Sequence, residues 1–151
     1  MKTIIADTSC LIIYDKINKL EILRDTFFEL MVTDEVAEEF GGELPGWITK
    51  RQIAKQDQYF ELAMNLEKGE ASSITLALEF EKSLLIIDER KGRKVAEKMK
   101  IEIIGPLGVL IKAKEKGAIE SVKDILNLID KTNFRISDSI KEQVLRKTGE
   151  L

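Results

Sequence analysis

The sequence predicts an α/β fold with a parallel sheet of four to five strands and helices on both faces, followed by additional C-terminal helices. Short apolar runs typical of buried strands alternate with helical patterns along residues 1–104. Such alternation is typical of parallel sheets in three-layer α/β/α domains. After Gly105 and Pro106 the pattern is helical only. The length of 151 residues fits one domain, so we expect a single domain over 1–151, with an α/β core and a helical extension over 105–151.

The expected elements follow from the period of the apolar residues, taken in chain order. Strands are expected at 2–6, 28–32, 84–87 and 101–104. Residues 47–54 fit either a strand or an irregular extended segment. Helices are expected at 10–17, at a short segment carrying Leu20, Leu23 and Phe27, and at 34–40, 57–66, 70–81, 89–99, 107–116, 121–131 and 138–147.

Several helix ends carry recognisable capping residues. Thr33 stands where an N-cap is needed for the helix over 34–40, and Gly41 with Gly42 follows it as a C-cap and loop. Gly117 is the expected C-cap of the helix over 107–116. Ser121, with Asp124 three residues later, resembles a capping box with Asp in place of Glu or Gln.

The composition limits the classes of function. The net charge of −3 excludes a globally basic nucleic-acid coat, although a local basic patch remains compatible with it. The lone cysteine, Cys10, excludes an intrachain disulfide, and no leader or membrane-spanning run is visible, so we expect a cytoplasmic protein. The absence of histidine excludes Ser-His-Asp and Cys-His catalysis in their usual forms and the common zinc sites.

Two expected strands end in a carboxylate. Asp7 follows Ile4-Ile5-Ala6, and Asp88 follows the run from Leu84 to Ile87. Open α/β sheets bind ligands at the carboxyl ends of their strands, beside a switch in strand order, so both acids are expected at one edge. The alternative for each acid alone is that it caps the helix that follows.

Two further acids belong to helices. Glu70 falls near the middle of the apolar stripe of its helix, where a carboxylate is costly unless paired or metal-bound. Alternatively, the helix start lies beyond the core and Glu70 merely favours the helix dipole. In the helix over 34–40, Glu39 flanks the inward face most closely, whereas Glu35 and Glu38 are expected on a solvated face.

Carboxylates that converge in a chain without histidine suit the hard cations Mg²⁺ or Mn²⁺. Such a site activates water and stabilises charge that develops on a phosphoryl group. The hydroxyls and backbone N–H groups of Thr8 and Ser9 are then placed to hold a carboxylate or a phosphate. Basic residues follow Asp88 and are candidates for phosphodiester contacts, or else form an ordinary solvated helix face: Arg90, Lys91, Arg93 and Lys94.

The ordered set of these segments resembles a PIN domain. The matching segments are Ile5-Ala6-Asp7-Thr8-Ser9, Val32-Thr33-Asp34-Glu35-Val36 leading to Glu39, Gly69-Glu70-Ala71, and Ile87-Asp88-Glu89 with Gly92-Arg93. The tail is similar to one prokaryotic branch of VapC-like PIN proteins. The matching pieces there are Gly105-Pro106-Leu107-Gly108-Val109-Leu110, Ala113-Lys114-Glu115-Lys116-Gly117 and Phe134-Arg135-Ile136-Ser137.

The resemblance implies a metal-dependent ribonuclease whose acids bind one or two Mg²⁺ or Mn²⁺ ions. Asp7, Glu39, Glu70 and Asp88 would be its first to fourth acids, although many VapC proteins carry Asp where Glu70 stands. The resemblance also implies a homodimer that a small antitoxin holds inactive, as the toxin of a toxin–antitoxin pair.

Other functions compete with this one. A phosphatase of the haloacid-dehalogenase type also starts with a strand that ends in Asp, but its second Asp is replaced here by Ser9, and no clear catalytic lysine motif follows. A response-regulator receiver carries paired acids near its start, and this sequence lacks them. A catalytically inactive PIN-like module that binds RNA or a protein is the remaining alternative, and the four acids argue against it, because clustered charges are costly to retain.

Overall fold

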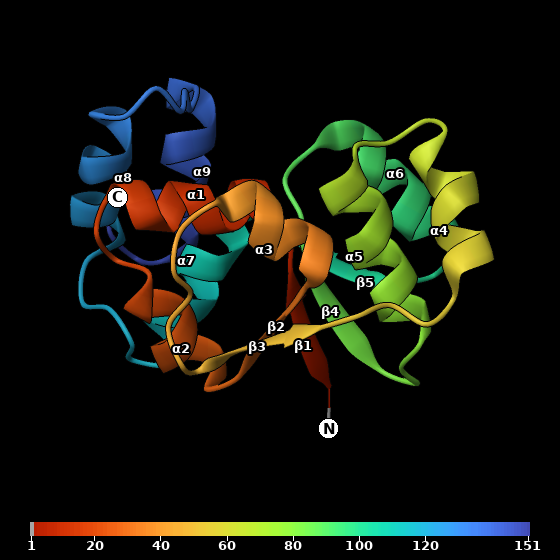
Figure 1. Ribbon diagram of the computed structural model, residues 1–151. Helices are drawn as coiled ribbons and strands as arrows, with labels where there is room; N and C mark the ends of the chain where they lie inside the picture. The colour runs from red at the N-terminus through yellow and green to blue at the C-terminus, as the bar shows by residue number, and fades with distance from the viewer. Residues whose placement is uncertain (1) are drawn as a thin grey trace.

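The computed structural model describes residues 2–151 and places five parallel strands of this part of the chain in one sheet (Figure 1). The strands are β1 (Thr3–Ala6), β2 (Leu30–Thr33), β3 (Ile48–Arg51), β4 (Ser83–Ile86) and β5 (Glu102–Ile104). Every prediction of a strand is confirmed, and the ambiguous segment over 47–54 contains β3. The sheet order is β3-β2-β1-β4-β5, so β3 lies at an edge, where its polar side chains are tolerated.

This strand order places β1 at the centre of the sheet. β1 pairs with β2 on one side and with β4 on the other, where Thr3 lies opposite Ser83 and Ala6 opposite Ile86. The chain moves outward from β1 to β3, returns across β1 to β4, and then moves outward the other way to β5. The switch in strand order therefore lies between β1 and β4, the two strands that end at Asp7 and Asp88.

The described part of the chain also contains nine helices. They are α1 (Thr8–Lys16), α2 (Glu21–Phe27), α3 (Asp34–Phe40), α4 (Gln56–Ala63), α5 (Lys68–Leu78), α6 (Arg90–Lys98), α7 (Pro106–Glu115), α8 (Val122–Asp130) and α9 (Asp138–Lys147). All were expected, with ends that differ by a few residues. The helix predicted over 70–81 begins earlier, at Lys68, because the backbone of Glu67 is still extended and serves as its N-cap.

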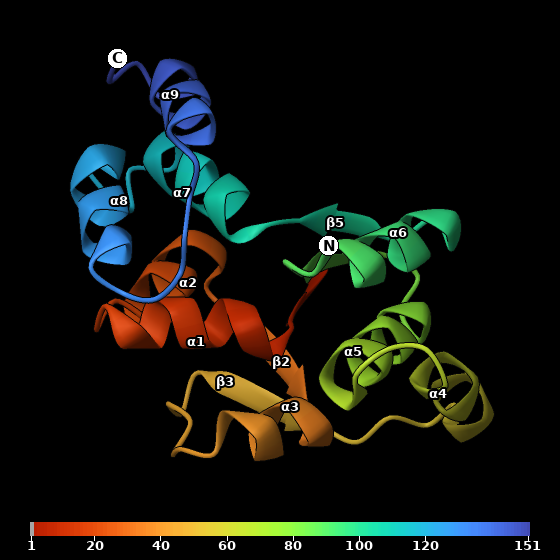
Figure 2. The same cartoon turned by 90° about the horizontal axis from the view of Figure 1, so that it is seen from above.

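Alternate residues of the strands face two separate cores, which gives the three layers (Figures 1 and 2). Ala6 and Ile86 belong to the core under α1, α2, α7, α8 and α9. Ile5 and Leu85 point to the opposite face and pack with residues of α4, α5 and α6. Because neighbouring strand residues point to opposite sides, continuous apolar runs are required in a sheet that is covered on both faces.

The predicted caps Thr33, Gly41 and Ser121 are confirmed, whereas the C-cap of α7 is Lys116, and Gly117, with a left-handed φ of 76°, follows it. Thr33 Oγ1 accepts a hydrogen bond from the Val36 N–H at 3.0 Å, and Gly41 adopts a left-handed φ of 74° at the end of α3. Ser121 Oγ accepts from the Asp124 N–H at 3.1 Å at the start of α8. These caps fix where the chain enters and leaves the helices.

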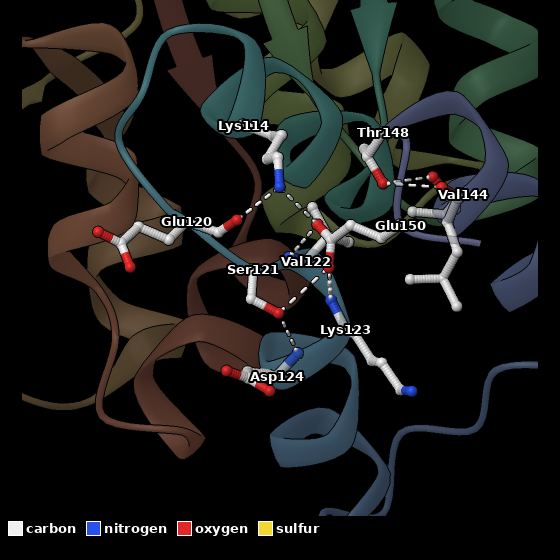
Figure 3. Close-up of polar contacts among 10 residues, drawn as sticks. Lys114, Glu120, Ser121, Val122, Lys123, Asp124, Val144, Thr148 and Glu150 are labelled. Carbon is white, nitrogen blue, oxygen red and sulfur yellow. Dashed lines mark hydrogen bonds and ion pairs between the residues drawn. The ribbon is translucent and has the colours of Figure 1, made fainter.

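The start of α8 is also held by a carboxylate near the end of the chain, that of Glu150 (Figure 3). Glu150 accepts hydrogen bonds from the Val122 N–H at 2.7 Å and the Lys123 N–H at 3.1 Å. Ser121 Oγ and Lys114 Nζ also donate to it, at 3.1 Å and 3.0 Å. Burial raises the pKa of Glu150, but these donors outweigh burial and lower it to about 2. We call this group the Glu150 clamp.

Within residues 2–151, each helix is too short or too polar to cross a lipid bilayer.

Candidate functional site

A cavity of about 660 Å³ opens at the carboxyl ends of the strands, where α1, α3, α5 and α6 begin or end. Its lining comes from distant parts of the sequence, and acidic side chains predominate. The lining residues are Asp7, Thr8, Ser9, Ile12, Glu39, Asn65, Leu66, Glu67, Glu70, Glu89 and Lys91. The cavity thus lies at the switch in strand order, where α/β sheets bind ligands.

Asp7 is delivered to this cavity by the central strand. Its residue is only 3% exposed, and its backbone N–H donates to the Ile86 carbonyl of β4 at 2.9 Å. Asp7 occupies the N-cap position of α1, yet its side chain makes no capping hydrogen bond. Ser9 Oγ approaches one of its oxygens at 3.5 Å, at the limit of a hydrogen bond. Helix capping therefore does not explain the carboxylate at this position.

Glu39 reaches the cavity from the last turn of α3. Thr8 Oγ1 donates a hydrogen bond of 2.6 Å to its Oε1, which ties α3 to the start of α1. Thr8 is buried, whereas the Glu39 residue as a whole is exposed. Of the acids in α3, Glu39 is the one that lines the cavity, as its angular position predicts.

Glu70 is a buried carboxylate with an unpaired oxygen. It lies in the first turn of α5, is 7% exposed, and its Oε2 has no hydrogen-bond partner among residues 2–151. A Cβ built on Gly92 of α6 would lie 2.8 Å from that oxygen, so α6 covers it closely. The prediction that Glu70 belongs to the buried face of its helix is confirmed. An unpaired buried carboxylate oxygen is costly, and a bound cation would offset that cost.

Asp88 lies at the same edge of the sheet but is not part of the cavity lining. Asp88 is half-buried. Burial raises the pKa of the Cys10 thiol, and the negative charges of Asp7 and Asp88 raise it further, so both acids lie near this thiol. Burial raises the pKa of Asp88, and Arg93 opposes this shift. Arg93 Nη1 also donates to the Ile87 carbonyl at 3.2 Å. Arg93 is thus bound to the protein itself beside Asp88.

The acids of the cavity perturb one another. Burial raises the pKa of Asp7 to about 6, with further contributions from the charges of Glu39 and Glu67, against hydrogen bonds from Thr8 and Ser9. Burial also raises the pKa of Glu70 to about 7, and the charges of Asp7 and Glu89 add to the effect. Clustered carboxylates with raised pKa values are characteristic of functional sites.

Only some of the residues predicted to position the substrate line the cavity. Thr8, Ser9 and Lys91 line the cavity, and Lys91 is the one basic residue that does so within residues 2–151. Arg90 is exposed at the start of α6, outside the lining. The structure therefore brings one of the four predicted basic residues, Lys91, to the cavity.

Sequence reasoning missed two acids of the cavity, Glu67 and Glu89. Each is the N-cap residue of its helix, α5 or α6, and neither side chain makes a capping bond. An acid directly before a helix that starts at the carboxyl edge of the sheet was the signal available. Glu35 also differs from expectation: it is half-buried, and its Oε1 is buried without a partner.

The residues at the cavity fit a hard divalent cation by their chemistry. The donors are carboxylate and hydroxyl oxygens, one carboxylate oxygen of Glu70 is unpaired, and the raised pKa values indicate that positive charge would be stabilised here. Among residues 2–151, no three acid or thiol side chains lie close enough together in this structure to hold a metal ion. Asp7 and Glu70 are fixed by burial and Glu39 is held by the hydrogen bond from Thr8, so a bound cation would draw the side chains of the cavity closer together than they lie here.

Comparison with known proteins identifies the family. A family model described as a PIN domain matches residues 3–150, almost the whole chain. Searches of curated proteins and of solved structures found no match. The matched range includes every acid of the cavity, and the five-stranded parallel sheet between two helical layers agrees with the fold. The chain therefore belongs to the PIN-domain family.

Proposed function

We propose that this protein is a ribonuclease that hydrolyses RNA phosphodiester bonds at the acidic cavity with Mg²⁺ or Mn²⁺. PIN domains are generally nucleases, which sets the reaction class. The observation that carries the proposal is the unpaired, buried Oε2 of Glu70 beside Asp7, in a cavity where both carboxylates have raised pKa values. An unligated acidic pocket of this kind repels RNA, so a cation is required for the substrate to enter.

Asp7, Glu39, Glu70 and Asp88 are the residues that would hold the metal. A bound Mg²⁺ or Mn²⁺ supplies positive charge that stabilises the phosphoryl group and makes water more acidic. Asp7 and Glu70 give the site rigidity because both are buried, and Thr8 holds Glu39 by a hydrogen bond. Lys91, which lines the cavity, and Arg90, its neighbour on α6, would contact phosphates of the RNA backbone.

The test is RNA cleavage by the purified protein in Mn²⁺, Mg²⁺ or EDTA, with end-labelled tRNA and single-stranded oligomers. Wild type is expected to cut in either metal and not in EDTA. Asp7→Asn, purified identically, is expected to be inactive, which controls for contaminating ribonuclease. Asp15→Asn is the matched control, because Asp15 is an exposed aspartate on the same helix, α1, and should cut like wild type.

Three kinds of outcome would contradict the proposal. Cutting that persists in EDTA, or that Asp7→Asn shares with wild type, assigns the activity to a contaminant or to another site. Absence of cutting, together with no shift of the melting temperature in Mn²⁺, favours the inactive binding module, because a ligand that binds the folded state raises Tm. Since water is the attacking group, a trapped covalent intermediate between enzyme and RNA would contradict the mechanism.

We extend the proposal to a cellular role as the toxin of a toxin–antitoxin pair, a cytoplasmic homodimer bound by a small antitoxin. The support is the VapC-like resemblance of the sequence, above all in its helical tail. Expression of wild type, but not of Asp7→Asn, is expected to arrest growth, and co-expression of the antitoxin should relieve the arrest. Light scattering of the purified protein tests the dimer.

A further inference from the structure

Gly69 of α5 lies directly against the side chains of Thr8 and Glu39, which are joined by a hydrogen bond. It is the second residue of α5, and it is buried. A Cβ built on Gly69 would overlap Oε1 of Glu39 and would lie 2.8 Å from Oγ1 of Thr8. Carbon and oxygen atoms that are not bonded do not approach so closely. The carboxylate of Glu39 therefore occupies the space that any other side chain at position 69 would fill.

The backbone does not explain a glycine at this position. Gly69 has no positive φ, unlike Gly41, so its conformation is open to every residue. Glycine also lowers the stability of a helix compared with alanine. The contact with Glu39 and Thr8 is the structural reason for its presence.

The contact affects a carboxylate that is free to move. Glu39 is exposed, and within the described part of the chain its side chain accepts one hydrogen bond, from Thr8. When the space at Gly69 is filled, the side chain of Glu39 can turn into solvent, and the hydroxyl of Thr8, which the new Cβ would meet at 2.8 Å, has to rotate away as well. At Gly92 the situation differs, because the oxygen that a Cβ would meet belongs to the buried Glu70, and the side chain of Ile87 is also within 2.9 Å.

We propose that Gly69 is a positioning residue, whose missing side chain is the space in which Glu39 is held by Thr8 at the cavity. The inference rests on the proposed function, because Glu39 matters there as a ligand of the metal. It goes beyond that function by assigning to Gly69 and Thr8 the control of one ligand. Filling the space is expected to weaken metal binding without weakening the fold.

The experiment compares five proteins by thermal melting in EDTA and in Mn²⁺: wild type, Gly69→Ala, Thr8→Val, Glu39→Gln and Gly46→Ala. Gly46 is the matched control, since a Cβ there meets nothing within 4 Å and its φ is not positive. Gly69→Ala is expected to melt in EDTA at or above the wild-type temperature. In Mn²⁺, its rise in Tm should fall to that of Glu39→Gln, whereas Gly46→Ala keeps the wild-type rise.

Thr8→Val removes the donor by a different route and should lose the same part of the Mn²⁺ response. The double variant Gly69→Ala/Thr8→Val should lose no more than either alone, because both release one carboxylate. A crystal structure of metal-free Gly69→Ala should show Glu39 displaced from Thr8. This readout is independent of both metal and activity.

Three results would overturn the inference while the proposed function stands: a wild-type Mn²⁺ response in Gly69→Ala, a lowered Tm of this variant in EDTA, or Glu39 still bound to Thr8 in its crystal structure. The first shows that the position of Glu39 is unaffected, and the second shows that Gly69 serves the fold. A wild-type protein without any Mn²⁺ response would instead overturn the proposed function, and the crystal structure would still decide the position of Glu39.

Discussion

Glu70 and Glu150 are the same residue type, each beside the first turn of a helix, yet their surroundings are opposite. Glu150 accepts from two backbone N–H groups, a hydroxyl and a lysine, and its pKa is lowered to about 2. Glu70 is buried beside other acids, its Oε2 has no partner, and its pKa is raised to about 7. The fold fully satisfies the carboxylate in its helical tail and leaves the one in its cavity unsatisfied.

The different surroundings suit different roles: those of Glu150 stabilise the fold, and those of Glu70 suit the binding of a cation. A carboxylate with every oxygen bonded lowers the free energy of the folded state, so the Glu150 clamp holds α8 to the end of the chain. An unpaired carboxylate raises that free energy until a cation binds. The following predictions use one substitution, Glu to Gln, to test whether the two sites differ in this way.

The largest expected effect is on RNA cleavage. Glu70→Gln removes a charged metal ligand and should lower the rate of cleavage in Mn²⁺ by at least about 100-fold, more than the loss of an outer partner costs. Glu150→Gln should cut like wild type at a temperature where both are folded. Cleavage rates measured under single-turnover conditions test this, and an equal loss in both variants would contradict the distinction.

The next effect is on stability at the clamp. Glu150→Gln replaces an ionised acceptor, removes the ion pair with Lys114, and should lower the free energy of unfolding at pH 7 by about 2–3 kcal/mol. Urea denaturation measures this. Glu142→Gln is the matched control, because Glu142 pairs with Arg146 on an exposed surface, where such a pair contributes less than about 0.5 kcal/mol. Equal effects would show that the clamp contributes no more than a surface ion pair.

Glu70→Gln should shift stability in the opposite direction. At pH 8 in EDTA the wild-type carboxylate is ionised although burial disfavours its charge, so the neutral amide should raise the free energy of unfolding by on the order of 1 kcal/mol. Urea denaturation in EDTA measures this gain. With Mn²⁺ in excess the order should reverse, since the metal stabilises wild type more strongly. A loss of stability in EDTA would indicate that Glu70 serves the fold.

The smallest effect is the dependence of these differences on pH. The folded-state pKa of Glu70 is raised, so its penalty is complete above about pH 7 and disappears as pH falls toward its ordinary value of 4.5. The folded-state pKa of Glu150 is lowered, so its contribution is complete above 4.5 and is lost as pH falls toward about 2. Denaturation of wild type and each Gln variant at several pH values should show these two separate windows.

The sequence predicts the fold well because each element has a local cause. Continuous apolar runs such as Leu84–Ile87 require a sheet covered on both faces, and Thr33, Gly41 and Ser121 mark helix ends by their own chemistry. Element ends shift where no local signal exists, as at the early start of α5. The strand status of 47–54 depended on an edge position that only the complete sheet decides.

The site was predicted only in part, for a physical reason. Asp7 and Glu70 are identified because a buried strand or an apolar stripe leads to each. The role of Glu67 and Glu89 depends on how α5 and α6 start relative to the sheet, and the sequence does not encode that distance locally. The engagement of Arg93 by the Ile87 carbonyl is likewise a tertiary contact.

The central position of β1 also orders the assembly of the molecule during its synthesis. β1 and α1 are made early, but the strand that pairs with β1 on its far side, β4, emerges from the ribosome only after α5. Until then, Asp7 lies on a strand with one neighbour and Asp88 does not yet exist. In the nascent chain, Asp7, Glu39 and Glu70 are therefore made before the cavity that they line can be completed.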